Sequence, residues 1–145
     1  MMMSSQRVVL DTNVLISAVL FRGQLSILSQ MIDEGEVVPC FSDETFEEFI
    51  IVASRPKFQK IFSVTGIILD EVVRKLRTRS LFFSSIKIPP VVLDDPTDDK
   101  FLACALASST EYLVSGDQHL LSVCKYGKIK IVTPKQFLII HKKPT

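Results

Sequence analysis

VVLDTN, residues 8–13, joins a short apolar run to a carboxylate and two small polar residues. An apolar run with no polar member predicts a strand that is buried on both faces, as in a parallel sheet. Apolar residues then recur from Val14 to Val19, which predicts a helix. Asp11 therefore stands where a buried strand ends and a helix begins.

The same alternation of short strands and helices continues along the chain. Further strands are expected at 37–40, 81–86, 112–115 and 129–132, and helices at 25–32, 43–53 with Ser42 as N-cap, from Pro56 to about 79, 98–108, near His119 and after Pro134. This order predicts a parallel sheet with helices on both faces. We expect an α/β fold with three layers, α/β/α, around a mostly parallel sheet of about five strands.

Length and composition fit one domain. The chain has 145 residues, 47% of them hydrophobic, and no repeat, so we expect a single domain over 1–145 with flexible ends at 1–6 and 142–145. Seventeen Lys and Arg against sixteen Asp and Glu give no overall nucleic-acid signature. No apolar run is long enough to span a bilayer and no export signal is present, so we expect a cytoplasmic protein without membrane contact. The three cysteines lack metal-ligand spacing and are expected to be buried apolar residues.

Acidic residues gather where the predicted strands end. Asp11 follows the first strand and Asp117 follows the strand at 112–115, while Asp94, Asp95, Asp98 and Asp99 precede or open the helix at 98–108. In a parallel sheet the functional crevice lies beyond the carboxyl ends of the strands. Each residue also has a structural alternative, as a helix N-cap, a partner of the helix dipole or a turn residue.

Carboxylates that converge at one sheet edge repel each other and must take up protons or bind a cation. Oxygen ligands without His or thiolate suit Mg²⁺ or Mn²⁺. Such a site activates water and stabilises the leaving oxygen of a phosphodiester, so phosphate-ester hydrolysis is the expected chemistry. A fourth acid should come from the helix at 43–53, but periodicity does not choose among Glu44, Glu47 and Glu48, and a solvated acidic face is an equal alternative.

Four blocks of the sequence, in this order, resemble the PIN-domain ribonucleases. They are VVLDTNVLISA at 8–18, SDETFEE at 42–48 followed by SRPKF at 54–58, DPTDDKFLACA at 95–105, and YLVSGDQHLL at 112–121. The likeness extends from about Arg7 to Phe137 and is greatest to the toxin components of type II toxin–antitoxin systems, the relatives of VapC-type toxins.

The resemblance implies an acidic quartet that holds one or two Mg²⁺ or Mn²⁺ ions, made of Asp11, Glu48, Asp99 and Asp117. Asp98 matches a position that is often acidic in this subgroup and is a further candidate ligand or a helix cap. Asn13 and Ser115 match polar positions that orient ligands or substrate.

The activity implied by the resemblance is cleavage of single-stranded RNA by a water that the ions activate. The implied partners are a small antitoxin, which would hold the toxin inactive, and a second copy of the chain in a homodimer. This chemistry needs no protein nucleophile, and His119 is interpreted as a residue at a helix start in preference to a proton shuttle.

Basic residues outside the quartet are candidates for binding RNA phosphates. Residues 55–79 hold seven bases and two acids, and the chain after Asp117 holds six lysines and no acid. Arg22, Arg55 and Lys57 are the candidate phosphate contacts. The alternative is an ordinary solvated surface.

Two other functions remain open from the residues. A haloacid-dehalogenase-like phosphatase also begins with an apolar strand and Asp, but that family has a second Asp where this chain has Asn13. The other is a PIN-like RNA-binding or regulatory protein, which would have the same fold but would not cleave RNA efficiently.

Overall fold

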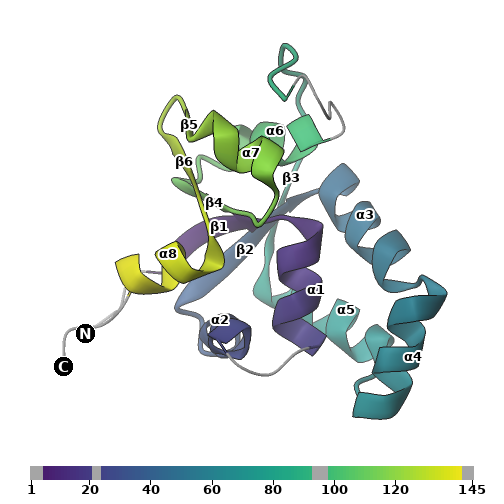
Figure 1. The fold of residues 1–145 in the computed structure, drawn as a ribbon. Coiled ribbons are helices and arrows are strands. Elements are labelled where there is room, and N and C mark those ends of the chain that lie inside the picture. The colour runs from purple at the N-terminus through teal and green to yellow at the C-terminus, as the bar shows by residue number, and fades with distance from the viewer. Residues whose placement is uncertain (1–4, 21–23, 93–97, 142–145) are drawn as a thin grey trace.

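The structure, a computed structural model, describes residues 5–20, 24–92 and 98–141. A central sheet lies between two groups of helices (Figure 1). In chain order the elements are β1 (Gln6–Leu10), α1 (Thr12–Leu20), α2 (Gln24–Asp33), β2 (Val37–Ser42), α3 (Asp43–Ala53), α4 (Pro56–Thr65), α5 (Leu69–Arg79), β3 (Leu81–Phe83), α6 (Asp99–Ala107), β4 (Tyr112–Val114), α7 (Gln118–Val123), β5 (Lys125–Tyr126), β6 (Ile129–Val132) and α8 (Pro134–Ile140). No helix in these described ranges is both long and apolar enough to cross a membrane.

The sheet has the strand order β3-β2-β1-β4-β6-β5, and every neighbouring pair is parallel except β5 and β6. The chain moves outward from β1 through β2 to β3 and then returns to β4 on the other side of β1. The strand order therefore reverses between β1 and β4. In open α/β sheets this switch point is where a crevice forms at the carboxyl ends of the strands.

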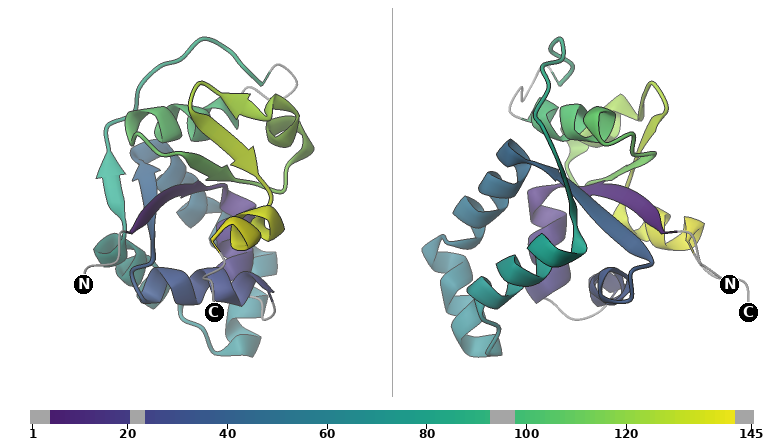
Figure 2. Two further views of the ribbon diagram at one scale, coloured as in Figure 1. Left: turned by 90° about the vertical axis from the view of Figure 1, so that its left-hand side faces the viewer. Right: turned by 180° about the vertical axis from the view of Figure 1, so that it is seen from behind.

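Alternate residues of β1 point to opposite faces of the sheet, as a strand requires. Val8 and Leu10 belong to a core that includes Leu15 of α1, whereas Val9 packs with Leu102 of α6 on the other face. Figures 1 and 2 show α6 and α7 on one side of the sheet and α1, α2 and α8 on the other. The expected three-layer α/β/α fold is confirmed.

Ser42 ends β2 and starts α3, as its sequence context predicts. Its hydroxyl accepts a hydrogen bond from Thr45 N at 3.3 Å, and Thr45 Oγ1 accepts from Ser42 N at 2.9 Å. This reciprocal cap satisfies two backbone donors that would otherwise lack partners. It sets α3 directly after the strand, with Phe46 and Phe49 buried in the core.

The described sheet has six strands where about five were expected. The additional strand, β5, is only two residues long and forms a hairpin with β6 through Gly127, whose φ of 59° lies in the left-handed region. Gln6, expected in a flexible end, already belongs to β1, and residues 1–4 and 142–145 lie outside the described ranges. Cys40 and Cys104 are buried as expected, but Cys124 is exposed because it ends α7 at the surface.

Candidate active site

Asp11, Ser115 and Asp117 meet at the switch point between β1 and β4. Asp11 is buried with 5% of its surface exposed, and Ser115 is fully buried. Ser115 Oγ donates to Asp11 Oδ2 at 2.5 Å and accepts from Asp117 N at 3.0 Å. The hydroxyl of Ser115, the first residue after β4, therefore connects Asp11, the first residue after β1, to Asp117.

Burial raises the pKa of Asp11 above its ordinary value, because a buried carboxylate loses the hydration of its charge. Hydrogen bonds from Ser115 and from the backbone at Val14 and Gly116 act in the opposite direction, and the negative charge of Asp117 raises the pKa further. The net shift is upward. A cation beside the Asp11 carboxylate would stabilise its charged form.

Asp11 and Asp117 each also cap a helix. Asp11 Oδ1 accepts from Val14 N at 2.8 Å at the start of α1, and Asp117 Oδ1 accepts from His119 N at 2.7 Å at the start of α7. Both carboxylates therefore also stabilise the first turn of a helix, which is the structural role expected as the alternative for Asp11. These caps leave Asp11 Oδ2 facing Ser115, on the side where Asp117 lies.

Glu48 contacts Thr12, the residue that follows Asp11. Thr12 Oγ1 donates to Glu48 Oε2, and Lys100 Nζ lies 2.6 Å from Glu48 Oε1. Glu48 is half-buried, whereas Glu44 and Glu47 are exposed. The helix α3 therefore directs Glu48 toward the β1–α1 junction, and the Lys100 ammonium neutralises its charge.

Asp99 opens α6 but its carboxylate is held by the preceding segment. Its Oδ1 accepts from Val92 N at 2.8 Å and its Oδ2 from Val91 N at 3.1 Å. Asp99 thereby fastens the chain before α6 to the first turn of that helix. Both of its carboxylate oxygens therefore already accept hydrogen bonds.

The remaining candidates lie at the starts of three helices, α6, α1 and α4. Asp98 is the N-cap residue of α6 without a side-chain capping bond, and Asn13 is exposed in the first turn of α1. Arg55 and Lys57 are exposed at the start of α4, where the Lys57 ammonium lies over the Phe58 ring. Arg22 lies outside the described residues, as do Asp94 and Asp95.

The structure links Asp11 to Asp117 through the Ser115 hydroxyl and brings Glu48 against the neighbouring Thr12, whereas Asp99 is held by backbone amides. It does not gather the carboxylates around one point: in the described ranges, no three His, Cys, Asp or Glu side chains form a group that could hold a metal as they stand. The donor set nevertheless fits Mg²⁺ or Mn²⁺, because it consists of oxygen ligands with a buried carboxylate whose charge is poorly compensated. To bind the ion, Glu48 would have to release Lys100, and Asp99 would have to release the backbone amides of Val91 and Val92.

Thr12 and Lys100 contact the candidate ligand Glu48, and neither was predicted from the sequence. Both are direct neighbours of predicted ligands, Thr12 of Asp11 and Lys100 of Asp99, and this adjacency is the one signal in the sequence that could have found them. Their contacts to Glu48 depend on how α3 packs against β1 and α6, which no local pattern records.

A family model described as "PIN domain" matches residues 7–119. The chain belongs to the PIN-domain family. PIN domains are typically metal-dependent nucleases, and all four predicted ligands of this PIN domain lie within the matched residues. No curated protein sequence matches the chain significantly.

Two solved structures are similar to this PIN domain. The crystal structure of FitAcB from Neisseria gonorrhoeae matches with a TM-score of 0.52 and 17% identity, over 88% of this chain and 98% of that one. The PIN domain of human SMG5 matches with a TM-score of 0.46 and 11% identity, over 94% of this chain and 99% of that one. At these identities the FitAcB match supports the fold.

Proposed function

We propose that this PIN domain is an endoribonuclease that hydrolyses single-stranded RNA with one or two Mg²⁺ or Mn²⁺ ions. The observation that carries the proposal is the Asp11–Ser115–Asp117 arrangement at the switch point of the sheet. There a buried carboxylate of raised pKa lies beside a second carboxylate, and both follow parallel strands that end at the same edge. A divalent cation relieves the repulsion in such a pair.

Each residue of the proposed site has a definite task. Asp11 and Asp117 hold the ion, with Glu48 and Asp99 completing the ligand set and Asp98 as a further candidate. Ser115 orients the Asp11 carboxylate, and a bound divalent ion supplies an acidified water and positive charge for the leaving oxygen. The buried setting of Asp11 keeps bulk water from screening its charge.

The substrate contacts are proposed at the exposed start of α4 and in the first turn of α1. Arg55 and Lys57 carry positive charge there and fit the phosphates of an RNA strand, and Asn13 offers an amide beside Asp11. Arg22, although outside the described residues, follows the end of α1 in sequence and belongs to the same proposal.

We also propose that the protein is a cytoplasmic toxin which a small antitoxin holds inactive, and that it forms a homodimer. The support for these partners is the resemblance of its four sequence blocks to VapC-type toxins. The neighbouring reading frame tests the toxin assignment: a short frame encoding a DNA-binding segment supports it, and its absence supports a free-standing nuclease.

A cleavage assay tests the nuclease directly. A fluorogenic single-stranded RNA is incubated with Mn²⁺ and with the wild type, Asp11→Asn or Asp99→Asn. We expect cleavage by the wild type and a loss of roughly 100-fold or more in the variants, since removal even of outer-shell partners of a metal costs about 10- to 100-fold. Absence of metal-dependent cleavage by the folded wild type would refute the proposal, and release of phosphate from small monoesters instead would favour a phosphatase.

One observation favours a second candidate, a PIN-like protein that binds RNA without efficient cleavage. Lys100 already neutralises Glu48, and backbone amides already occupy both Asp99 oxygens. A site with these internal partners could hold its ion too weakly for turnover. RNA binding without cleavage in the assay above would support this candidate.

A further inference from the structure

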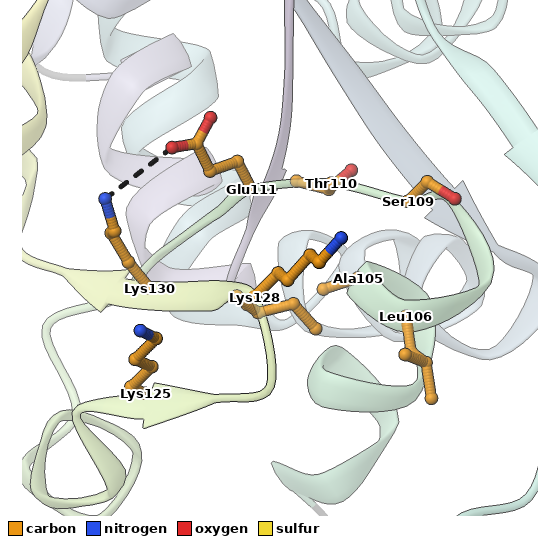
Figure 3. A pocket seen from close by; sticks show the side chains of 9 residues that line it. Ala105, Leu106, Ser109, Thr110, Glu111, Lys125, Lys128 and Lys130 are labelled. Carbon is orange, nitrogen blue, oxygen red and sulfur yellow. Dashed lines mark ion pairs between the residues drawn. The ribbon is translucent and has the colours of Figure 1, made fainter.

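A hollow of about 690 Å³ lies at the edge of the sheet opposite the carboxylates. It is bounded by the end of α6, by the segment from Ser109 to Glu111 that leads into β4, and by the β5–β6 hairpin. Figure 3 shows the side chains of Lys125, Lys128 and Lys130 around it. This hollow is separate from the proposed active site, because Glu111 precedes β4 whereas Ser115 and Asp117 follow it.

The hollow carries an excess of positive charge. Of its three lysines, Lys130 approaches Glu111 at 3.7 Å, and both of these side chains are about half exposed. Lys125 and Lys128 make no ion pair with any residue in the described ranges. They belong to the last part of the sequence, which has six lysines and no acid after Asp117.

The hairpin register places two of these lysines directly opposite each other. Lys125 of β5 pairs with Lys130 of β6 in the antiparallel ladder. Like charges at directly opposed positions destabilise a strand pair. A bound anion would relieve this repulsion, so the register strengthens the indication of an anion that the positive charge gives.

We propose that this hollow binds phosphate groups of an RNA strand beyond the bond that is cleaved. The proposal rests on the nuclease function proposed above. Lysine ammonium groups on flexible stems bind phosphates as point charges without reading sequence. The floor contains Ala105, Leu106 and Ile129 and no aromatic ring, so base stacking contributes little and contacts to the backbone dominate.

The two sites are far enough apart to make the effect depend on RNA length. Ser115 follows Glu111 by four positions, which corresponds to roughly 13 Å along the strand at about 3.3 Å per residue. A strand whose cleaved phosphate lies at Asp11 must therefore extend past β4 before it reaches the lysines. A longer strand can contact the lysines and the proposed active site at once, so its binding should depend on the lysines more than that of a short fragment.

The test measures fluorescence anisotropy of labelled single-stranded RNA in EDTA, where cleavage is absent, with oligomers of about 4 and about 16 nucleotides, the range of lengths that single-strand sites cover. The variant is Lys125→Glu/Lys128→Glu. Its matched control is Lys87→Glu/Lys135→Glu, which changes the net charge equally at two exposed lysines elsewhere. Glu at position 125 faces Lys130 favourably, so the variant should unfold at the same or a higher temperature than the wild type.

We expect the hollow variant to bind the long RNA at least tenfold more weakly than the control variant, with a smaller difference for the short RNA, because the short RNA contacts fewer cations of the protein at one time. The dependence of log K on log salt for the long RNA should become less steep by roughly 1.4, because each of the two lysines that neutralises a phosphate contributes about 0.7 to the slope. Equal binding of the long RNA by both variants would overturn the proposal. So would binding of polyglutamate to the wild type that is weaker in the hollow variant and that does not displace the RNA, because this would identify an acidic peptide site.

Inorganic phosphate and a mononucleotide, added as competitors of the long RNA, distinguish an RNA strand from a small phosphorylated ligand. Weak competition at millimolar concentration supports the strand. Tight binding of the mononucleotide that depends on Lys125 and Lys128 contradicts it. Binding is measured without cleavage, so failure of the nuclease proposal and failure of this one give different results.

Discussion

Lys100 Nζ lies 2.6 Å from Glu48 Oε1, so an ammonium group occupies the place at Glu48 where a metal ion is proposed to bind. The pair is partly exposed, with 21% of the Lys100 side chain and 28% of the Glu48 side chain accessible. Thr12 donates to the other Glu48 oxygen. The protein thus carries an internal cation that competes with the ion for one ligand.

Lys100→Met should tighten Mn²⁺ binding, because Glu48 then has no competing cation. A partly exposed ion pair is worth at most about 1 kcal/mol, so the expected gain is about fivefold in affinity. Isothermal titration calorimetry measures it, with Lys60→Met on the exposed face of α4 as the control. Weaker Mn²⁺ binding by Lys100→Met would mean that Lys100 supports the metal site instead of competing with it.

Asp11→Asn should stabilise the metal-free protein near neutral pH while it removes metal binding. The amide is uncharged and keeps an oxygen for Val14 N, but its nitrogen no longer accepts from Ser115. The cost of burying a negative charge disappears, and this gain outweighs the lost hydrogen bond because the net pKa shift of Asp11 is upward. Thermal unfolding in EDTA and in Mn²⁺ measures both effects. The account predicts a higher melting temperature in EDTA and no further rise with Mn²⁺; a rise equal to that of the wild type would contradict it.

The stability of the metal-free wild type should fall with rising pH over the range where Asp11 ionises. The pKa of Asp11 is raised in the folded protein above its ordinary value of 3.8. The stability that protonated Asp11 contributes is complete below 3.8 and is lost as pH rises through the raised folded-state pKa. Denaturant unfolding in EDTA across this range should show Asp11→Asn gaining on the wild type as pH increases. A difference that is constant with pH would argue against the raised pKa.

Ser115→Ala should weaken both the fold and the site. The fully buried hydroxyl donates to a carboxylate and accepts from Asp117 N, so its loss should lower the unfolding free energy by about 1–3 kcal/mol. Mn²⁺ affinity should fall as well, because the Asp11 carboxylate loses its orientation. Ser122→Ala, which removes an exposed hydroxyl on α7, is the control for stability. Ser115→Thr keeps the hydroxyl and should retain Mn²⁺ affinity; equal affinity in Ser115→Ala would exclude an orienting role.

The sequence was sufficient to place Asp11 and Asp117 at one edge of the sheet. Both residues follow short apolar runs, which predict strands. Because parallel strands have their carboxyl ends at one edge of the sheet, the two residues are predicted to lie at that edge. Ser42 was predictable for a similar reason, since an N-cap is a local feature of the backbone. The strand β5 was not predictable, because two residues have no period.

The partners of Glu48 and Asp99 could not be read from the sequence. The contact of Lys100 with Glu48 requires α3 and α6 to pack at a particular rotation across the edge of the sheet. The hydrogen bonds from Val91 and Val92 to Asp99 require the irregular segment before α6 to fold back on its first turn. Both sets of contacts depend on tertiary packing, which produces no periodic pattern of residues in the sequence.

Anomalous diffraction from crystals soaked in Mn²⁺ tests the central claim most directly, because it locates the ion itself. The account predicts a peak between the Asp11 and Asp117 carboxylates in the wild type and no peak there in Asp11→Asn. With Mn²⁺ at a saturating concentration, a wild-type crystal without a peak at this position, or with Mn²⁺ bound only elsewhere, would contradict the account.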